Sequence, residues 1–172
     1  FESIQGKGTK FILHVPFEIS AEEQEKKSHM YQNCSVEGVQ ILLVEDNELN
    51  REIAYEFLVM ANARVECAAD GVEAFEKFRD SDPGHFDVIL MDMQMPRWNG
   101  VEATRNIRAL DHPDAKRIPI IAVTANAYFE DEQKCLEAGM NDHIAKPLDV
   151  QEFYKKVEKY FIIGKQEREN HD

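Results

Sequence analysis

The stretch Val39-Gln40-Ile41-Leu42-Leu43-Val44, which runs directly into Glu45-Asp46-Asn47, decides the fold. Its apolar part is too short for a helix and is apolar on both faces, as expected for a central strand of a parallel sheet. A helical pattern follows, in which four apolar residues share one face: Leu49, Ile53, Phe57 and Leu58. The stretch therefore predicts a buried strand that leads through an acidic turn into an amphipathic helix.

The same alternation of strand and helix continues along the chain. Further strands are expected at residues 64–67, 86–91, 118–123 and 143–145, and further helices at 70–78, 101–110, 128–138 and 150–161. Five strands that alternate with five helices predict an α/β fold with a doubly wound five-stranded parallel sheet, because right-handed crossovers place helices on both faces. The expected strand order is 2-1-3-4-5, in which ligands bind beyond the carboxyl ends of the strands.

Polar residues with complementary chemistry stand at these strand ends. The first strand runs into Glu45 and Asp46, and the third ends at Asp92. Crowded carboxylates repel one another unless a cation joins them, and a few carboxylate oxygens with open positions suit Mg²⁺. The fourth strand ends at the hydroxyl of Thr124 and the fifth at the ammonium group of Lys146. Because metal and lysine neutralise a transferring phosphoryl group, the set predicts phosphoryl transfer with Asp92 as the nucleophile.

Each of these residues, taken alone, has a simpler explanation. A strand-end Asp is commonly a helix N-cap, a Thr after a strand is commonly a cap or turn residue, and a Lys is commonly solvated. The prediction therefore rests on the whole set and on its position at one edge of the sheet.

Motifs over residues 39–161 resemble the receiver domain of two-component response regulators. They are, in order, Val44-Glu45-Asp46-Asn47, Met91-Asp92-Met93-Gln94-Met95-Pro96, Asn99-Gly100, Ala122-Val123-Thr124-Ala125 and Lys146-Pro147. The stretch LEAGMNDHIAKP at 136–147 is especially similar to receivers attached to hybrid sensor histidine kinases. The resemblance implies the (βα)5 flavodoxin-like receiver fold, which has the same strand order 2-1-3-4-5.

The resemblance also implies a metal site and a phosphoacceptor. Asp92 would take a phosphoryl group from a phosphohistidine. Mg²⁺, with Mn²⁺ as a substitute, would be bound by Asp46, Asp92 and the backbone carbonyl of Gln94, with Glu45 acting partly through water. The side chains of Gln94 and Asn126 are expected to border the path of hydrolytic water.

A conformational switch is the third implication. Thr124 would be the switch hydroxyl, and Lys146 would pair with the phosphoryl group, its peptide bond to Pro147 often being cis in this family. His143 stands where the family frequently has Tyr or Phe, so Thr124 and His143 are the expected switch pair.

The N-terminal residues resemble a different domain. Residues 1–18, with Gly6-Lys7-Gly8-Thr9, look like the last glycine box and final strand of the histidine kinase ATP-binding domain, although a turn before a strand also explains Gly-x-Gly. We expect a polar linker over 19–37, the receiver over 38–163 and a polar tail over 164–172. Because the chain starts at Phe1 without Met, we expect a piece of a longer hybrid histidine kinase, with this receiver as a relay or regulatory module at its end.

Composition limits the partners. With 20 Lys and Arg against 33 Asp and Glu, the formal net charge of −13 argues against binding to nucleic acid or an anionic membrane. Three widely spaced cysteines without a CxxC pair indicate reduced thiols, and no apolar run approaches the roughly 18 to 20 residues of a membrane span. We expect a cytoplasmic module, with a parent kinase that the inner membrane could anchor.

The expected partners are a histidine kinase or a histidine phosphotransfer domain. A homodimer through the fourth helix, fifth strand and fifth helix is a further assembly implied by the family. The fragment itself would be a signalling switch that promotes only its own phosphorylation and dephosphorylation.

Three other classes fit the sequence less well. A flavodoxin-like cofactor module needs a Ser, Thr and Gly loop after the first strand, where the acidic 45–48 segment would repel a phosphate. An aspartyl phosphatase needs a second Asp two residues after the nucleophile, where Gln94 stands. A receiver-like scaffold that binds partners without phosphorylation usually lacks an acid or the Lys, and all of these are present here.

Overall fold

The computed structural model describes residues 2–4, 8–10, 14, 36–125 and 129–169. The chain divides into two compact units, Phe1–Gln32 and Asn33–Asp172. In the first unit, β1 (Glu2–Ile4) and β2 (Gly8–Lys10) form an antiparallel pair in which Ser3 is opposite Thr9. Gly6 and Lys7 of the glycine motif lie outside the described residues, so the kinase-remnant reading stays a prediction.

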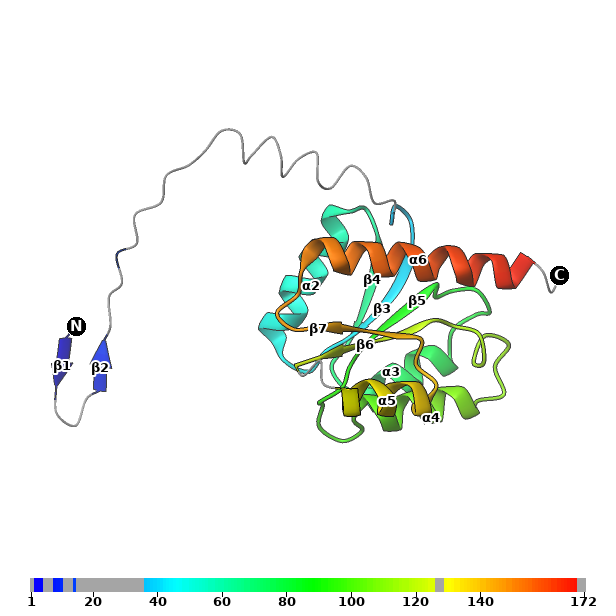
Figure 1. The fold of residues 1–172 in the computed structure, drawn as a ribbon. Coiled ribbons are helices and arrows are strands. Elements are labelled where there is room, and N and C mark those ends of the chain that lie inside the picture. The colour runs from blue at the N-terminus through cyan, green and yellow to red at the C-terminus, as the bar shows by residue number, and fades with distance from the viewer. Residues whose placement is uncertain (1, 5–7, 11–13, 15–35, 126–128, 170–172) are drawn as a thin grey trace. The chain divides into compact units, whose positions relative to one another are not determined.

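A five-stranded parallel sheet forms the centre of the second unit (Figure 1). Its strands are β3 (Gln40–Val44), β4 (Arg64–Ala68), β5 (Val88–Asp92), β6 (Ile120–Thr124) and β7 (Asp142–Ala145). Their spatial order is β4-β3-β5-β6-β7, and every neighbouring pair is parallel. Counted along this unit, the order is 2-1-3-4-5, so the predicted α/β fold and strand order are confirmed.

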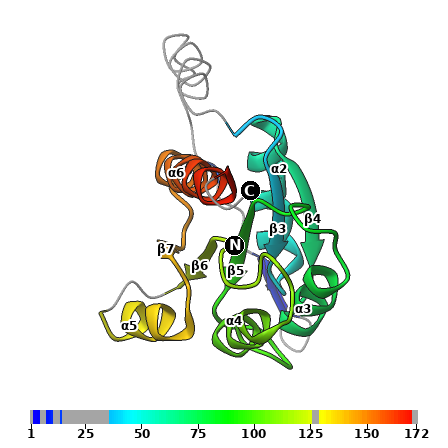
Figure 2. The same cartoon turned by 90° about the vertical axis from the view of Figure 1, so that its right-hand side faces the viewer.

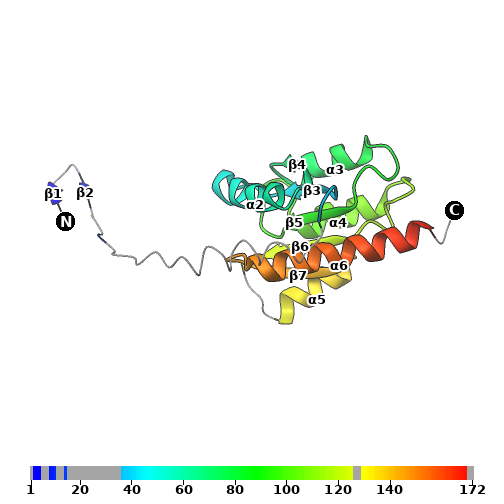
Figure 3. The same cartoon turned by 90° about the horizontal axis from the view of Figure 1, so that it is seen from above.

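Helices cover both faces of this sheet. Those of the described residues are α2 (Glu48–Met60), α3 (Gly71–Arg79), α4 (Gly100–Ala109), α5 (Phe129–Ala138) and α6 (Val150–Glu169). Figures 1 and 2 show α2 and α6 on one face and α3, α4 and α5 on the other. In Figure 3, α6 runs along the β6 and β7 side of the sheet. None of the described helices has the length and apolar character needed to cross a bilayer.

The interior strands form the core because they are apolar on both faces. Leu42 of β3, Ile89 of β5 and Ile121 of β6 have no exposed surface. Parallel strands of this kind need helices on both sides, which is the observed arrangement. All residues of β5 and β6 are buried, including Asp92 and Thr124 at their carboxyl ends.

Side-chain caps start α2 and α4. Asn47 accepts a hydrogen bond from the amide of Asn50 at 3.1 Å and so begins α2 directly after Asp46. Asn99 and Glu102 form a reciprocal capping box at the start of α4. These caps fix the residues at which α2 and α4 begin.

The core-facing side of α2 differs from the prediction. Leu49 is 64% exposed and Ile53 is 43% exposed, whereas α2 buries Ala54 and Leu58. The small Ala54 side chain, about 100° around the helix from Ile53, lets α2 lie close to the sheet on that face. The expected stripe through Leu49 and Ile53 was therefore wrong for these two residues.

Candidate functional site

Three carboxylates gather at the carboxyl edge of the sheet. Val44 of β3 pairs with Met91 of β5, so the residues that follow them, Glu45 and Asp92, lie next to each other. Glu45, Asp46 and Asp92 each offer an oxygen, and these oxygens all lie within 4.8 Å of one another. Glu45 and Asp92 are buried, while Asp46 is exposed. The structure thus brings together the three acids predicted from the strand ends.

Lys146, the residue that follows β7, joins this cluster. Its Nζ atom lies 2.6 Å from Glu45 Oε2 and 2.8 Å from Asp92 Oδ2. Burial acts to lower the pKa of Lys146, but hydrogen bonds to Asp92 and Glu45 outweigh it and raise the pKa. The ammonium group therefore stays charged, and it leaves part of the negative charge of the three carboxylates uncompensated. The Lys146–Pro147 peptide bond is cis, as the resemblance implies.

Glu45 shows the cost of crowding in this cluster. Burial raises the pKa of Glu45, and repulsion from Asp92 raises it further, against hydrogen bonds from Lys146 and Asn50. A nearby cation would therefore stabilise the ionised form of this carboxyl group. Oxygen donors with surplus negative charge are what Mg²⁺ prefers, so the residues present fit this ion.

The turn after Asp92 holds that side chain from the opposite side. The amide of Gln94 donates to Asp92 Oδ1 at 3.1 Å, so each oxygen of this carboxylate has a partner. Gly100, the first residue of α4, leaves no room for a side chain because a Cβ there would collide with the Asp92 backbone oxygen. The predicted role of Gln94 rests on its backbone carbonyl and stays a prediction.

Thr124 and His143 lie on the same side of the sheet. Thr124, which is buried, pairs with Ala145 of β7, and His143 pairs with Ala122 of β6. Since side chains two residues apart along a strand share a face, Thr124 and His143 are diagonal neighbours on one face. Asn126 lies outside the described residues, so its predicted place beside the water path stays a prediction.

Asn50 and Arg51 are site residues that sequence reasoning missed. Asn50 Nδ2 donates to Glu45 Oε1 at 3.1 Å, and Arg51 Nη1 donates to the Glu45 backbone oxygen at 2.7 Å. Both come from the first turns of α2, which folds back over the end of β3. A signal was present, because polar side chains one turn into a helix that follows an acidic strand end can reach that acid.

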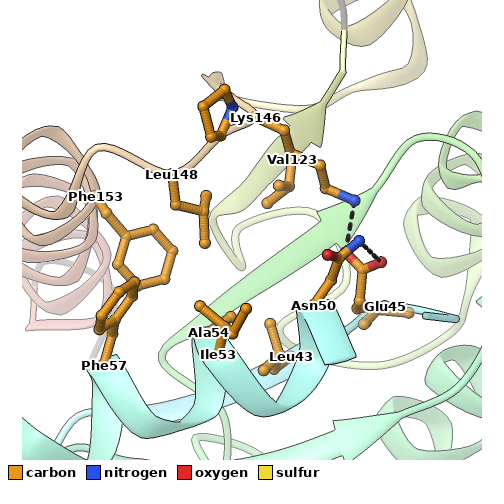
Figure 4. Close-up of a pocket in the computed structure, with 12 residues that line it drawn as sticks. Leu43, Glu45, Asn50, Ile53, Ala54, Phe57, Val123, Lys146, Leu148 and Phe153 are labelled. Carbon is orange, nitrogen blue, oxygen red and sulfur yellow. Dashed lines mark hydrogen bonds and ion pairs between the residues drawn. The ribbon is translucent and has the colours of Figure 1, made fainter. Parts of the chain in front are cut away.

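An apolar groove opens beside the acidic cluster (Figure 4). Figure 4 shows Ile53 and Phe57 of α2 facing Leu148 and Phe153, with Glu45, Asn50 and Lys146 at one end. The exposed Ile53 side chain therefore lines a surface that leads directly to the candidate site.

Comparisons with known proteins point to one family. A family model described as the response regulator receiver domain matches residues 41–158. Probable histidine kinase 2 of Oryza sativa subsp. indica is 41% identical over 125 residues, which cover 66% of this chain and 12% of that protein. Hybrid signal transduction histidine kinase L of Dictyostelium discoideum is 36% identical over 142 residues, which cover 82% of this chain and 8% of that protein. The chain thus spans a small part of the length of these relatives.

Two solved structures have the same fold. The receiver domain of sensor histidine kinase PA1611 from Pseudomonas aeruginosa PAO1, with a magnesium ion in its active site cleft, is 40% identical with a TM-score of 0.65, and the match covers 72% of this chain and 98% of that one. The second is the Saccharomyces cerevisiae complex of the phosphotransfer protein Ypd1 with the receiver domain of Ssk1. Its match is 28% identical with a TM-score of 0.64, and it covers 73% of this chain and 90% of that one.

Proposed function

Since the chain belongs to the response regulator receiver family, whose domains serve in two-component phosphorelays, we propose that Asp92 is its phosphoacceptor. The observation that carries the proposal is the pair formed by Asp92 and Lys146. The Oδ2 atom of this buried carboxylate lies 2.8 Å from the ammonium nitrogen, beside two further carboxylates. This arrangement offers one carboxylate as a nucleophile and one cation that stabilises the negative charge of a transferring phosphoryl group.

The proposed reaction moves the phosphoryl group from a phosphohistidine to Asp92. An Asp92 oxygen forms the new bond to phosphorus while the phosphorus–nitrogen bond breaks, and the imidazole nitrogen keeps the electron pair. Lys146 would then contact the phosphoryl oxygens, and the Thr124 hydroxyl would donate to one of them.

Mg²⁺ is the proposed cofactor because the donor set fits it. We assign Asp46, Asp92 and the Gln94 backbone carbonyl as ligands, with Glu45 acting partly through water and Mn²⁺ as a substitute ion. The bound ion would neutralise charge on the phosphoryl oxygens. The receiver domain of PA1611, which contains magnesium, supports this assignment.

The proposed donor is the phosphohistidine of a histidine kinase or a histidine phosphotransfer domain. Receiver domains form complexes with such proteins, as the Ypd1 and Ssk1 pair illustrates. The groove lined by Ile53, Phe57 and Leu148 adjoins Glu45 and Lys146, so a partner seated there would bring its histidine close to the acceptor.

The proposed output is a change of surface. Thr124 and His143 would report phosphorylation to the surface formed by α5, β7 and α6, through which we also propose a homodimer. The module would promote only its own phosphorylation and dephosphorylation.

We propose that the kinase activity belongs to a longer parent protein. The division would be a kinase-domain remnant at 1–18, a linker at 19–37, the receiver at 38–163 and a tail at 164–172. We place the module in the cytoplasm, in a parent that the inner membrane could anchor.

Acetyl phosphate supplies a direct test. Incubation with acetyl phosphate and Mg²⁺, followed by intact mass measurement, should show one added phosphoryl group, which chelation of Mg²⁺ should prevent. Asp92→Asn should abolish the gain, and Asp46→Ala should weaken metal binding. The control Asp111→Asn, which removes an exposed carboxylate after α4, should leave the gain unchanged. A wild-type chain that binds Mg²⁺ and gains nothing would favour the scaffold function that needs no phosphorylation.

A further inference from the structure

The loop at 93–99 connects β5 to α4 and carries Gln94. It is tied to the sheet by the Met93 amide, which donates to the Val123 oxygen at 3.1 Å. At its other end, the Asn99 cap begins α4. Between these two anchors, Arg97 has a φ of 63°, in the left-handed region that costs free energy for residues other than Gly.

An ion pair with α3 accompanies this unusual conformation. Arg97 Nε donates to Asp70 Oδ2 at 2.8 Å, and Arg97 Nη2 contacts the same oxygen. The other oxygen, Asp70 Oδ1, accepts from the amides of Val72 at 2.8 Å and Glu73 at 3.0 Å and so caps α3. Asp70 is only 9% exposed, so its position is fixed by the helix that it caps.

Backbone packing beside the ion pair leaves little free space. A Cβ at Gly71 would lie 2.6 Å from the Trp98 backbone oxygen. The Trp98 ring meets Phe75 of α3 edge to face, with ring centroids 5.4 Å apart. The loop is therefore held against the N-terminus of α3 by Arg97 and by its neighbour Trp98.

We propose that the Asp70–Arg97 ion pair is a positioning device for the Mg²⁺ site, because it holds the 93–99 loop in the conformation that presents the Gln94 carbonyl to the ion. This inference rests on the proposed function, in which that carbonyl is a ligand. A residue in a strained backbone conformation persists where its surroundings stabilise that conformation, and here the ion pair does so. Without it, Arg97 can relax, and binding Mg²⁺ must then restore the order of the loop.

The sign of the effect separates positioning from simple electrostatics. Arg97 carries a positive charge five residues after Asp92, so removing that charge alone would strengthen binding of a cation. Loss of positioning weakens it. We expect Arg97→Ala to reduce Mg²⁺ affinity about three- to tenfold. Replacing a residue that orients a metal ligand directly reduces metal affinity by about 10- to 100-fold, and the expected effect lies at or below the lower end of that range.

Binding of Mg²⁺ alone, without a phosphoryl donor, is the measurement. Trp98 is the single Trp of the chain, so its fluorescence can follow the titration, with calorimetry as an independent check. Asp70→Asn, which keeps a capping oxygen for α3 but loses the ion pair, should match Arg97→Ala, and the double variant should be no worse than either single one. Arg97→Lys should retain part of the affinity.

Arg79→Ala is the matched control. It removes the same charge from an exposed ion pair with Asp80 at the other end of α3, and its Mg²⁺ affinity should equal that of the wild type. Arg97→Gly removes the ion pair and the strain together, so reduced affinity in this variant shows that the ion pair itself matters. If Arg97→Ala and Asp70→Asn bind Mg²⁺ as tightly as the wild type or more tightly, the positioning role is wrong and the proposed metal site still stands. A wild-type chain that binds no Mg²⁺ overturns the proposed metal site as well.

Discussion

Lys146 Nζ lies 2.8 Å from Asp92 Oδ2 although Lys146 follows β7, Asp92 ends β5 and β6 lies between these strands. The long lysine side chain reaches across the end of β6 to the acid at the end of β5. The same nitrogen contacts Glu45, which follows β3. One side chain thus ties three strand ends together, at the edge where ligands bind in folds of this class.

We predict that Lys146→Gln separates phosphorylation from metal binding. Loss of the ammonium group should slow phosphorylation by acetyl phosphate about 100-fold, the usual effect of removing one electrostatic contact to the reacting group. Mg²⁺ affinity should stay equal or rise, because a competing cation has left the acidic cluster. Initial rates by mass measurement and a metal titration test this, with the exposed Lys155→Gln as the control. If rate and affinity fell together, Lys146 would act by holding the site in shape.

Strand ends are the part of this molecule that the sequence predicts best. A short run that is apolar on both faces has few alternatives to a buried parallel strand, and parallel strands bring their carboxyl ends to one edge. Glu45, Asp92 and Lys146 could therefore be placed together without coordinates. The bounds of the strands differ from the expected ranges by a residue or two, since β5 is Val88–Asp92 and β6 is Ile120–Thr124.

The sequence alone could not predict which side chains far apart in the chain form contacts. Arg97 and Asp70 are 27 residues apart, and the charge pattern of the sequence does not predict which acid forms an ion pair with an arginine in a loop. The buried face of α2 was misjudged for a related reason. Periodicity identifies apolar positions, but the small Ala54 determines which of them approach the sheet.

Arg108 is predicted to be a structural anchor of the region around α4. Its guanidinium donates to the backbone oxygens of Gly139 and Ala115, each at 2.9 Å, and to Asn141 Oδ1 at 3.1 Å. Burial lowers its pKa to about 10. Arg108→Met keeps the apolar stem but removes these hydrogen bonds and leaves the Gly139 and Ala115 backbone oxygens without this donor, which should reduce the free energy of unfolding by about 2 to 3 kcal/mol.

Urea unfolding measures this effect, and Arg105→Met on the same helix is the control. Arg105 is exposed, so its replacement should change stability by less than about 0.5 kcal/mol. Equal losses in the two variants would show that the Arg108 contacts add nothing specific.

The pH dependence of stability should carry a contribution from Asp142. Its carboxylate lies 3.0 Å from Lys156 Nζ and 3.5 Å from Lys159 Nζ. Burial acts to raise the pKa of Asp142, but hydrogen bonds from the His143 amide and from Lys156 hold it below the ordinary value of 3.8. A carboxyl group with a lowered pKa in the folded state stabilises the protein above its unfolded pKa, and this contribution is lost as the pH falls through the folded pKa.

Asp142→Asn should therefore cost about 1 kcal/mol at neutral pH, and the difference from wild type should shrink as the pH falls below 3.8. Urea unfolding of both proteins at neutral and acidic pH tests this. The exposed Asp111→Asn should show little difference at either pH. A cost for Asp142→Asn that stays constant with pH would contradict an origin in the charge of Asp142.

Phosphorylation should be coupled to His143 through Thr124. The strand register puts these residues on one face of the sheet, as diagonal neighbours on β6 and β7. We predict that the phosphoryl group draws the Thr124 hydroxyl toward its oxygens and that the His143 side chain then moves into the space that is vacated. The surface formed by α5, β7 and α6 would change with it, because β7 lies at the edge of the sheet.

The imidazole resonances of His143 report this motion directly. They should shift when beryllofluoride, a phosphoryl mimic, is added with Mg²⁺ to the wild type, and Thr124→Ala should abolish the shift because the hydroxyl that moves is gone. His85, a half-buried residue paired with Glu66 on β4, supplies an internal control that should respond in neither protein. Imidazole is smaller than the phenol ring common at this position, so the displaced volume is smaller and the coupling should be shallower than with Tyr. His143→Tyr should then enlarge the surface change, which amide shifts on α5 and α6 would measure. An equal response of His143 with and without the Thr124 hydroxyl would mean that the two residues move independently.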